Sequence, residues 1–486
     1  MELMRQWRRH LRVRGRWLGR RARGVAVRRP GHAAAFGLGV MLVMALGLAS
    51  CHRPWQVREP ARVTAPSSTL SYGIEPTIRV RIRETVTSAE LGSDRALFIR
   101  LPEAREGSPR RTVVLSGSAR VSLDGGEVTL TPIAGVAASE GGVMASAGAV
   151  RARASREDAR AMEIAPTSGE ITVDGVSYPG FVRIVPRTDA GPAAFDVVAT
   201  IPMEAYVAGV IARELYASWR PATFEAQAIA ARSYALHERA RAEASGRAYD
   251  VESTTRDQVF GGSTQLAVAI AGARSTRGVV LIHGEGTAAE LLRTYYSSTC
   301  GGRAAGATET WPSGAGFEFN RAEALRATGR ACDCSGSGLH RWTRTRTLSE
   351  LSDRVRTWGR TNHADAARLG VLQSVEVVER NSTGRPTRFE LRDVHGRRVT
   401  LRAEDFRVAS NWAASGTPAI TRATRVPSGD TEVTVRAGTV RYIGRGFGHG
   451  VGMCQFGAQQ MASSGQNWEA ILGRYYPGAR WRRVYP

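Results

Sequence analysis

The chain has 486 residues, of which 42% are hydrophobic, and this is enough for two or three domains with buried cores. Its net charge of +23 would suggest a nucleic-acid partner, but residues 1–31 hold eleven arginines and one glutamate, so the rest of the chain carries only +13. All 67 basic residues are arginines. P-loop, Schiff-base and Ser-Lys chemistry are excluded, because each requires a lysine. With the positive charge concentrated at the N-terminus, we expect no nucleic-acid partner.

Residues 1–50 predict a lipoprotein signal peptide. An arginine-rich start precedes an apolar stretch from Ala33 to Leu48, and the small residues Ala49 and Ser50 then precede Cys51. This pattern is typical of a bacterial lipoprotein, in which the cysteine is lipidated and becomes the mature N-terminus. An uncleaved membrane anchor is the alternative, although the stretch is short for a spanning helix of roughly 20 residues. We expect a lipid-anchored envelope protein on the periplasmic face, and His52 after the cysteine favours the outer membrane if Gram-negative sorting applies.

Alternating polar and apolar residues predict a β-rich domain at residues 76–193, after a lipidated cysteine and flexible tether at residues 51–75. Its expected strands cover residues 77–82, 96–101, 111–115 and 127–130. Two further strands, at 173–182 and 195–201, are expected to lead into the first helix of the next domain. Helices and strands mix over residues 194–486, with a helix at about 348–358 and strands at 372–379, 386–392 and 397–402. We therefore expect an α+β fold: an N-terminal β-rich domain followed by a mixed α+β domain.

Residues 201–236 predict two helices and present one carboxylate. Tyr206, Val210 and Ile211 recur at helical spacing, so Glu214 lies beside a buried face. Burial raises the pKa of a carboxyl group, as a general acid at neutral pH requires. An exposed or capping glutamate is the alternative interpretation.

Pro221 should open the second helix, because the residue before a proline is disfavoured in the helical conformation. The sequence predicts an apolar stripe on this helix and polar residues on its other faces. The stripe consists of Phe224, Ala228, Ala231 and Ala235, and the polar residues are Gln227, Arg232 and Ser233.

Residues 444–458 contain six glycines, and five of them lie around Phe447 and His449, before a helix-compatible run from Met453 to Met461. Glycines at this density let the backbone approach a ligand closely or adopt positive φ. A dinucleotide site is not expected, because no Rossmann unit surrounds the segment.

Together with residues 257–262 (DQVFGG), 296–303 (YSSTCGGR) and 475–478 (YYPG), these segments resemble the stage II sporulation protein D (SpoIID/LytB) family of peptidoglycan-acting proteins. The segments occur in the family's order, and the resemblance covers residues 195–480. It implies a SpoIID-type catalytic domain at residues 194–486 and a lytic transglycosylase that cuts the MurNAc–GlcNAc bond. The family's catalytic glutamate aligns with Glu214, whereas Cys454 stands where many members have serine.

A single acid fits this activity. Ordinary glycoside hydrolysis uses two carboxylates roughly 5 to 9.5 Å apart, but Glu204 would lie about 15 Å from Glu214 along one helix. One acid suffices when the attacking group is the sugar's own C6 hydroxyl. Glu214 would first protonate the departing oxygen and then accept the proton from O6 as the 1,6-anhydro ring closes.

Six further polar residues within the family-like segments are candidate substrate-binding groups, able to donate or accept hydrogen bonds from sugar hydroxyls or acetamides. A structural role is the alternative for each, and Arg232 could instead pair with Glu225 or Glu238. The six are His449, Gln455, Gln227, Arg232, Asp257 and Gln258.

Cys51 aside, the chain has four cysteines, at positions 300, 332, 334 and 454. Some family members carry zinc near the CGG segment, and Cys300, Cys332, Cys334 and Cys454 with His340 nearby could form one structural zinc site. Disulfides are the rival in an oxidising compartment, and free thiols are the third option. Cleavage itself requires no cofactor.

Three classes of function remain at this point. We expect a lipid-anchored transglycosylase that acts on peptidoglycan glycan strands. A non-catalytic module that binds glycan and recruits or activates an amidase is the alternative. A metal or serine hydrolase is disfavoured, because the chain has neither HExxH nor GxSxG.

Overall fold

The computed structural model describes residues 71–102, 110–134, 144–145, 149–153, 161–187, 189–286, 289–329 and 331–486. The predicted signal peptide, Cys51 and the tether up to residue 70 lie outside these residues. No helix in the described part of the chain is both long and apolar enough to cross a membrane.

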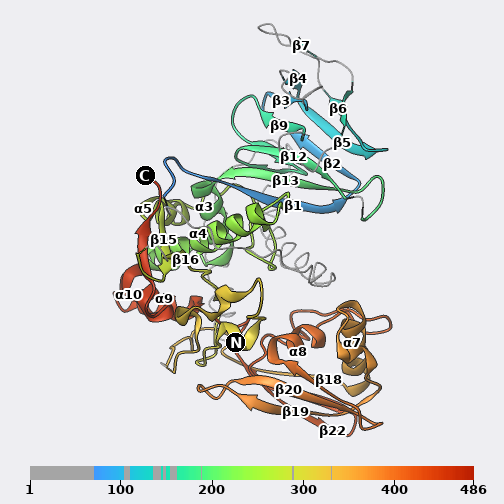
Figure 1. Ribbon diagram of the computed structural model, residues 1–486, viewed down its shortest axis with the longest axis vertical. Helices are drawn as coiled ribbons and strands as arrows, with labels where there is room; N and C mark the ends of the chain where they lie inside the picture. Colours follow the sequence, from blue (N-terminus) through green and yellow to red (C-terminus); the bar gives the residue numbers. More distant parts are fainter. Residues whose placement is uncertain are drawn as a thin grey trace, which may run out of the picture. The chain divides into compact units, whose positions relative to one another are not determined.

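Two β-sheets form the N-terminal part of the described chain (Figure 1). The first has the order β14-β1-β13-β12-β9-β3-β4-β7 and the second the order β11-β10-β2-β5-β6-β8. Val80 and Ile99 from the first sheet and Leu91 and Val121 from the second belong to one buried core, so the sheets pack against each other. The first sheet contains β1 (Thr77–Val86), β3 (Ala96–Arg100), β4 (Thr112–Ser116), β7 (Met144–Ala145), β9 (Glu163–Pro166), β12 (Phe181–Pro186), β13 (Phe195–Pro202) and β14 (Val251–Glu252). The second contains β2 (Ser88–Gly92), β5 (Ser118–Asp124), β6 (Glu127–Ala134), β8 (Val150–Arg153), β10 (Ile171–Val173) and β11 (Val176–Tyr178).

The β-rich prediction is confirmed, but the strand expected at 173–182 is wrong. Positive φ at Asp174, Gly175 and Gly180 breaks this stretch into the ends of three short strands, β10, β11 and β12. Strand β13 pairs with both β1 and β12, so the first sheet continues past residue 194.

Helices α3 (Met203–Glu214) and α4 (Pro221–Ala244) follow β13 directly, as the sequence predicts. Helix α4 contacts α3, α5 (Ala267–Ser275), α9 (Gln455–Ser463) and α10 (Trp468–Tyr475), so it is covered on several sides. Two small sheets complete this part: β16 (Glu290–Leu291), β15 (Val279–His283) and β25 (Arg480–Arg483) form one, and β17 (Tyr296–Ser297) pairs in parallel with β24 (Met453–Cys454) in the other.

Residues 341–445 form a further α+β unit with its own core. Helices α7 (Leu348–Thr361) and α8 (Ala403–Ser410) lie along the same side of the orange strands in Figure 1. The strands are β18 (Arg341–Thr347), β19 (Leu372–Arg380), β20 (Pro386–Asp393), β21 (Arg398–Arg402), β22 (Thr431–Arg436) and β23 (Thr439–Arg445). Helix α7 confirms the helix expected at about 348–358, and β19, β20 and β21 confirm the three strands expected between 372 and 402.

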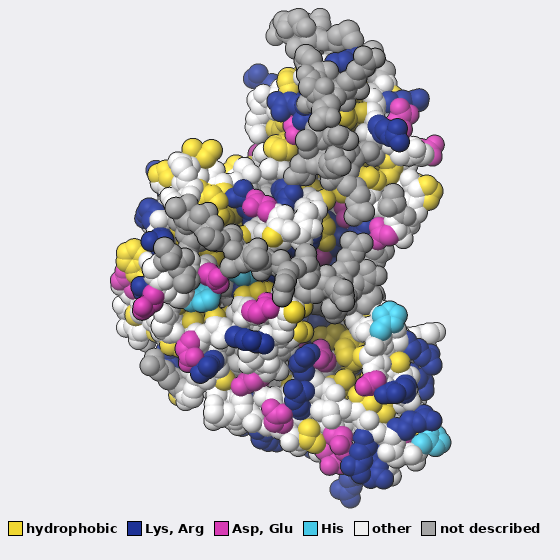
Figure 2. Space-filling view, in the orientation of Figure 1, with side chains coloured by type: hydrophobic (Ala, Val, Ile, Leu, Met, Phe, Trp, Pro, Cys, Tyr) yellow, Lys and Arg dark blue, Asp and Glu magenta, His cyan; other side chains and the backbone are white. Residues whose placement is uncertain are grey.

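Arginine side chains gather over these strands in the space-filling view (Figure 2). Acidic residues on neighbouring strands neutralise part of this charge. Arg388 pairs with Glu379 at 3.0 Å, and Arg398 lies 3.5 Å from Glu390. Such exposed pairs each stabilise a fold by only about 0–1 kcal/mol.

Candidate active site

Helix α3 positions Glu214 as its last residue. Tyr206, Val210 and Ile211 are fully buried along its inner face, and the chain turns to an extended conformation at Leu215. At Gly209 a β-carbon would lie 2.4 Å from a ring carbon of Phe260 and 2.6 Å from the Gly262 carbonyl oxygen. The missing side chain therefore lets α3 pack directly on the segment 257–262.

Two neutral donors hold the carboxyl group of Glu214. The backbone N–H of Val259 donates to Oε1 at 3.2 Å, and the Gln455 amide donates to Oε2 at 3.4 Å. Burial raises the pKa of Glu214, and these two hydrogen bonds only partly oppose the rise. The residue as a whole is partly exposed although its carboxyl group is desolvated. Glu214 therefore holds a proton more readily than an ordinary glutamate, and part of the residue remains exposed.

Buried amides and phenols extend the polar surroundings of Glu214. The Gln455 amide lies 3.5 Å from the Gln227 carbonyl oxygen, and Gln227 Nε2 is buried without a hydrogen-bond partner. Gln258 accepts from the Tyr206 hydroxyl at 2.9 Å and donates to the Tyr296 hydroxyl at 3.0 Å.

Burial raises the pKa of both tyrosines, and the negative charge of Glu214 raises it further. The phenols therefore stay protonated beside Glu214. Tyr206, Tyr296 and the Val259 N–H were not predicted from the sequence. The signal for Tyr206 was its position two helical turns before Glu214, and Tyr296 lies in a family-like segment.

Arg232 lies in a different environment from these amides. It is fully buried, and its guanidinium pairs with Glu204 at 2.6 Å and donates to the carbonyl oxygens of Val279 and Ala273. If Arg232 had a structural role, Glu225 or Glu238 was its expected partner. Its partner is instead Glu204, because α3 and α4 pack side by side. Arg232 thus supports the fold.

The same pair removes Glu204 as a second catalytic acid. Glu204 also accepts from the Tyr485 hydroxyl at 2.6 Å and from the backbone N–H of Gly278 at 3.2 Å. Burial alone would raise its pKa, but Arg232 and these hydrogen bonds outweigh burial and lower it. Glu204 is therefore a paired, ionised group.

Asp257 is held in a buried network. It accepts from the Tyr234 hydroxyl at 2.7 Å and from the backbone N–H of Glu252 at 2.9 Å, and Arg293 donates to the same tyrosine. Its described contacts fix the turn that delivers the next two residues to the site.

His449 packs against aromatic rings. Its ring lies 4.9 Å from that of Trp311 and 6.0 Å from that of Tyr295, and its Nδ1 accepts from the Val451 N–H at 3.1 Å. Burial lowers its pKa to about 4, although the nearby Glu404 opposes the change. The imidazole is therefore neutral at pH 7, and none of its described contacts is with Glu214.

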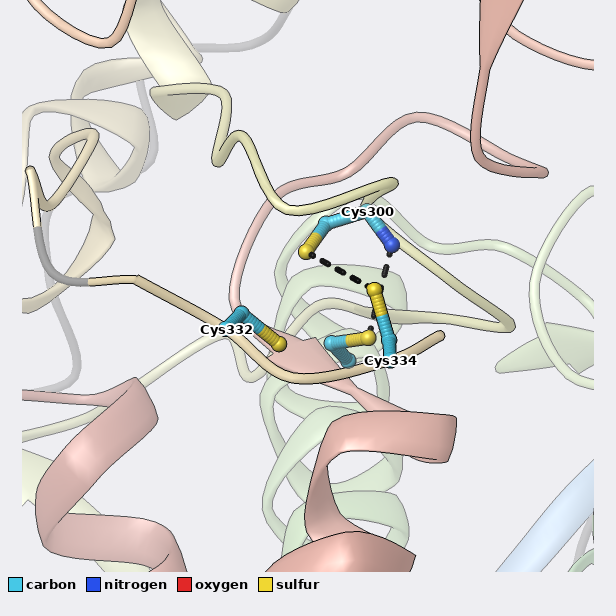
Figure 3. A group of neighbouring side chains, drawn as sticks. Cys300, Cys332 and Cys334 are labelled. Atoms are coloured by element: carbon cyan, nitrogen blue, oxygen red, sulfur yellow. Dashed lines mark hydrogen bonds between the residues drawn. The ribbon is translucent and has the colours of Figure 1, made fainter. Parts of the chain in front are cut away.

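The four predicted thiols come together in one cluster (Figure 3). All four sulfur atoms lie within 4.8 Å of one another, and those of Cys300 and Cys334 are 3.9 Å apart. Cys334 also lies 3.4 Å from Nδ1 of His340. A disulfide needs sulfur atoms about 2.05 Å apart, whereas a tetrahedral zinc site with bonds of about 2.3 Å has sulfur–sulfur edges of about 3.8 Å. The spacing of the donor set fits a zinc ion bound by four cysteines.

The thiol cluster adjoins the support of Glu214. Cys454 is the last residue of β24, and the next residue, Gln455, begins α9 and donates to Glu214. The backbone N–H of Cys300 donates to the Cys454 sulfur at 3.4 Å. A bond that fixes Cys454 therefore also fixes the origin of the Gln455 side chain.

Two family models match this chain. Residues 193–283 match the model described as Stage II sporulation protein (SpoIID), and residues 318–452 match a domain of unknown function (DUF8618). The first range contains Glu214, Gln227 and Gln258, whereas Gln455 lies beyond both.

Similar curated proteins have low identity over long alignments. An uncharacterized protein of Brachyspira hyodysenteriae is 26% identical over 315 residues, which are 64% of this chain and 74% of that protein. The amidase enhancer of Bacillus subtilis is 26% identical over 335 residues, covering 64% of this chain and 45% of that protein. Stage II sporulation protein D of Bacillus subtilis is 25% identical over 301 residues, covering 58% and 75%.

Proposed function

Since residues 193–283 of this chain belong to the stage II sporulation protein D family, we propose that it is a lytic transglycosylase of the cell envelope. It cleaves MurNAc–GlcNAc bonds in peptidoglycan glycan strands and leaves a 1,6-anhydroMurNAc end. The relatives named as an amidase enhancer and a sporulation protein support the broader peptidoglycan-related role.

The environment of Glu214 carries the proposal. Burial raises the pKa of this carboxyl group, and among the described residues no second carboxylate contributes to the shift. Glu204 is engaged by Arg232, so it is not available as a base that activates water. A single acid with a raised pKa suits an intramolecular reaction better than a hydrolysis that uses two carboxylates.

In the first step Glu214 donates its proton to the glycosidic oxygen as the bond from that oxygen to C1 of MurNAc breaks. The carboxylate that results is stabilised by the Val259 N–H and the Gln455 amide, which already point at its two oxygens. In the second step the C6 hydroxyl bonds to C1 and its proton passes to Glu214. The acid is thereby regenerated, and no water is consumed.

A zinc ion at Cys300, Cys332, Cys334 and Cys454 would have a structural role. Four thiolates fill a tetrahedral site and leave no open position for a water or a sugar. When bound, the ion would cross-link the segments that carry these cysteines. Every proton transfer proposed above is made by Glu214.

A lipid on Cys51 would tether this activity to a membrane surface, and His52 favours the outer membrane if Gram-negative sorting applies. The glycan strands of the adjoining wall would then be within reach of the tethered protein. The envelope location follows from the same proposed substrate.

The relative named amidase enhancer favours a second candidate function. In that case the chain binds glycan strands without cutting them and recruits or activates an amidase. Glu214 and its amides would then serve only as polar contacts to the sugar.

Digestion of purified sacculi with the full chain tests the proposal. Mass spectrometry should detect 1,6-anhydro muropeptides, and Glu214→Gln should reduce their release by roughly 10² to 10⁴-fold, since it removes the transferable proton. Glu243→Gln is the matched control, because Glu243 is exposed on α4 and pairs only with Arg239 among the described residues.

Release at the wild-type rate by the Glu214→Gln variant would refute the assignment of this acid. If the wild-type chain releases no anhydro product but raises the rate of an added amidase, the second candidate is correct.

A further inference from the structure

Three aromatic side chains form a partly exposed cluster at the end of α3. Tyr216 is 59% exposed, and its ring lies 5.3 Å from that of Trp219 and 6.0 Å from that of Phe456. The rings of Trp219 and Phe456 are 5.0 Å apart and nearly perpendicular. We refer to these three residues as the aromatic platform.

Hydrogen bonds hold both parts of the platform in place. Tyr216 and Trp219 belong to one turn between α3 and α4, in which the Trp219 N–H donates to the Tyr216 carbonyl oxygen at 2.9 Å. Phe456 lies in the first turn of α9. Helix α9 is tied to the α3–α4 turn by Gln459, which accepts from the Arg220 N–H at 2.9 Å and from the Thr223 hydroxyl at 2.8 Å. The platform is therefore preorganised.

The platform residues lie close in the chain to Glu214 and to Gln455. Tyr216 is two residues after Glu214 in the chain, and Phe456 directly follows Gln455, whose amide donates to Glu214. A ligand whose reacting bond lies at Glu214 therefore has the platform as its neighbour.

The side chains around the aromatic platform indicate what kind of ligand it binds. Ring faces offer apolar contact, while Glu214, Gln455 and the buried Gln227 amide offer hydrogen bonds alongside. A pyranose ring has the same division, with C–H groups on its faces and hydroxyl or acetamide groups at its edge. A stable protein partner would need about 800 Å² of surface on each side, which is far more than three partly buried rings present.

We propose that Tyr216, Trp219 and Phe456 form a sugar subsite that takes the apolar face of an N-acetylhexosamine next to the scissile bond. Only the identity of the bound strand rests on the proposed function. The subsite adds affinity and register to the site, whereas Glu214 supplies the proton.

Binding to purified sacculi, measured by co-sedimentation of the full chain carrying Glu214→Gln, separates this subsite from cleavage. Adding Tyr216→Ala should weaken binding roughly 3- to 10-fold, as loss of one aromatic contact typically does, and Tyr216→Phe should restore it. Trp481→Ala is the matched control, because Trp481 is 55% exposed on β25 and contacts Trp468 instead of the platform.

Unchanged binding by Tyr216→Ala would overturn the subsite, even if anhydro products still depend on Glu214. Conversely, weakened binding by Tyr216→Ala and not by Trp481→Ala supports the subsite even if the wild-type chain releases no anhydro product. If Tyr216→Ala lost only the association with an added amidase, the platform would be a protein contact and the proposal would be wrong.

Discussion

Removing the zinc ion that we propose for the thiol cluster should destabilise the chain strongly. The four sulfur atoms already lie within 4.8 Å of one another, so they need to move by less than about 1 Å to reach the edges of about 3.8 Å that a zinc tetrahedron has. Structural zinc binds with about 10–16 kcal/mol in small zinc domains, whereas a whole domain is stable by about 5–15 kcal/mol. Even a loss of about 3 kcal/mol lowers the Tm of a domain of 150–250 residues by roughly 6–12 °C.

The assay combines elemental analysis with thermal denaturation of the purified full chain. We expect about one zinc per chain, a drop in Tm of at least several degrees with a strong chelator, and recovery when zinc is added back. Cys454→Ser should lower both the zinc content and the Tm, and it should also reduce cleavage, because Gln455 follows directly and holds Glu214.

Two results would refute this reasoning. A metal-free chain whose Tm is indifferent to chelator but falls with reductant would contain disulfides, and alkylation would then increase its mass only after reduction. A Cys454→Ser variant with full stability and full activity would show that this sulfur makes neither bond.

Three further changes test separate parts of the structure. Burial raises the pKa of Glu214 in the folded chain, so ionisation of this group reduces stability as the pH rises from about 4.3, the unfolded value, through the folded pKa. Glu214→Gln should therefore have a higher Tm than the wild type at pH 7–8 and the same Tm below about pH 4. Equal Tm values at pH 8 would contradict the raised pKa. Arg232→Met should reduce the free energy of unfolding by about 3–5 kcal/mol in denaturant titrations, because Glu204 loses its cation, whereas unchanged stability with weaker sacculus binding would instead indicate a sugar contact. Cys51→Ala should abolish incorporation of labelled palmitate and release the chain from the detergent fraction, and unchanged labelling would refute the lipoprotein prediction.

Local sequence patterns predicted the elements around the acid well. The α3–α4 pair, its break before Pro221 and the buried stripe of Phe224 and Ala228 follow from helical spacing and from the geometry of proline. The pattern did not predict that Gln227 and Arg232 are equally buried. Periodicity identifies a helix's apolar face, but it does not reveal that neighbouring elements cover the polar faces as well.

Contacts between distant segments account for the rest of what the sequence could not predict. Gln455 and Gln258 were candidates for sugar binding, and the structure places Gln455 on Glu214 and Gln258 between two tyrosines. His449 came from the same glycine-rich segment as Gln455, yet its ring packs on Trp311. The positions of the glycines could not reveal which side chains of this segment face the acid, because that depends on how β24 pairs with β17.

The separation of Glu214 from Gln455 along the chain also bears on the order of folding. The hydrogen bond between them joins residues 241 positions apart, and that between Tyr485 and Glu204 joins residues 281 positions apart. Contacts of such long range form slowly, because a large loop must close before they contribute stability. In a chain that has folded only as far as α4, Glu214 therefore lacks the hydrogen bond from the Gln455 amide. We expect strand cleavage to appear late in refolding, after α9 docks on α4, so that unfinished chains are inactive.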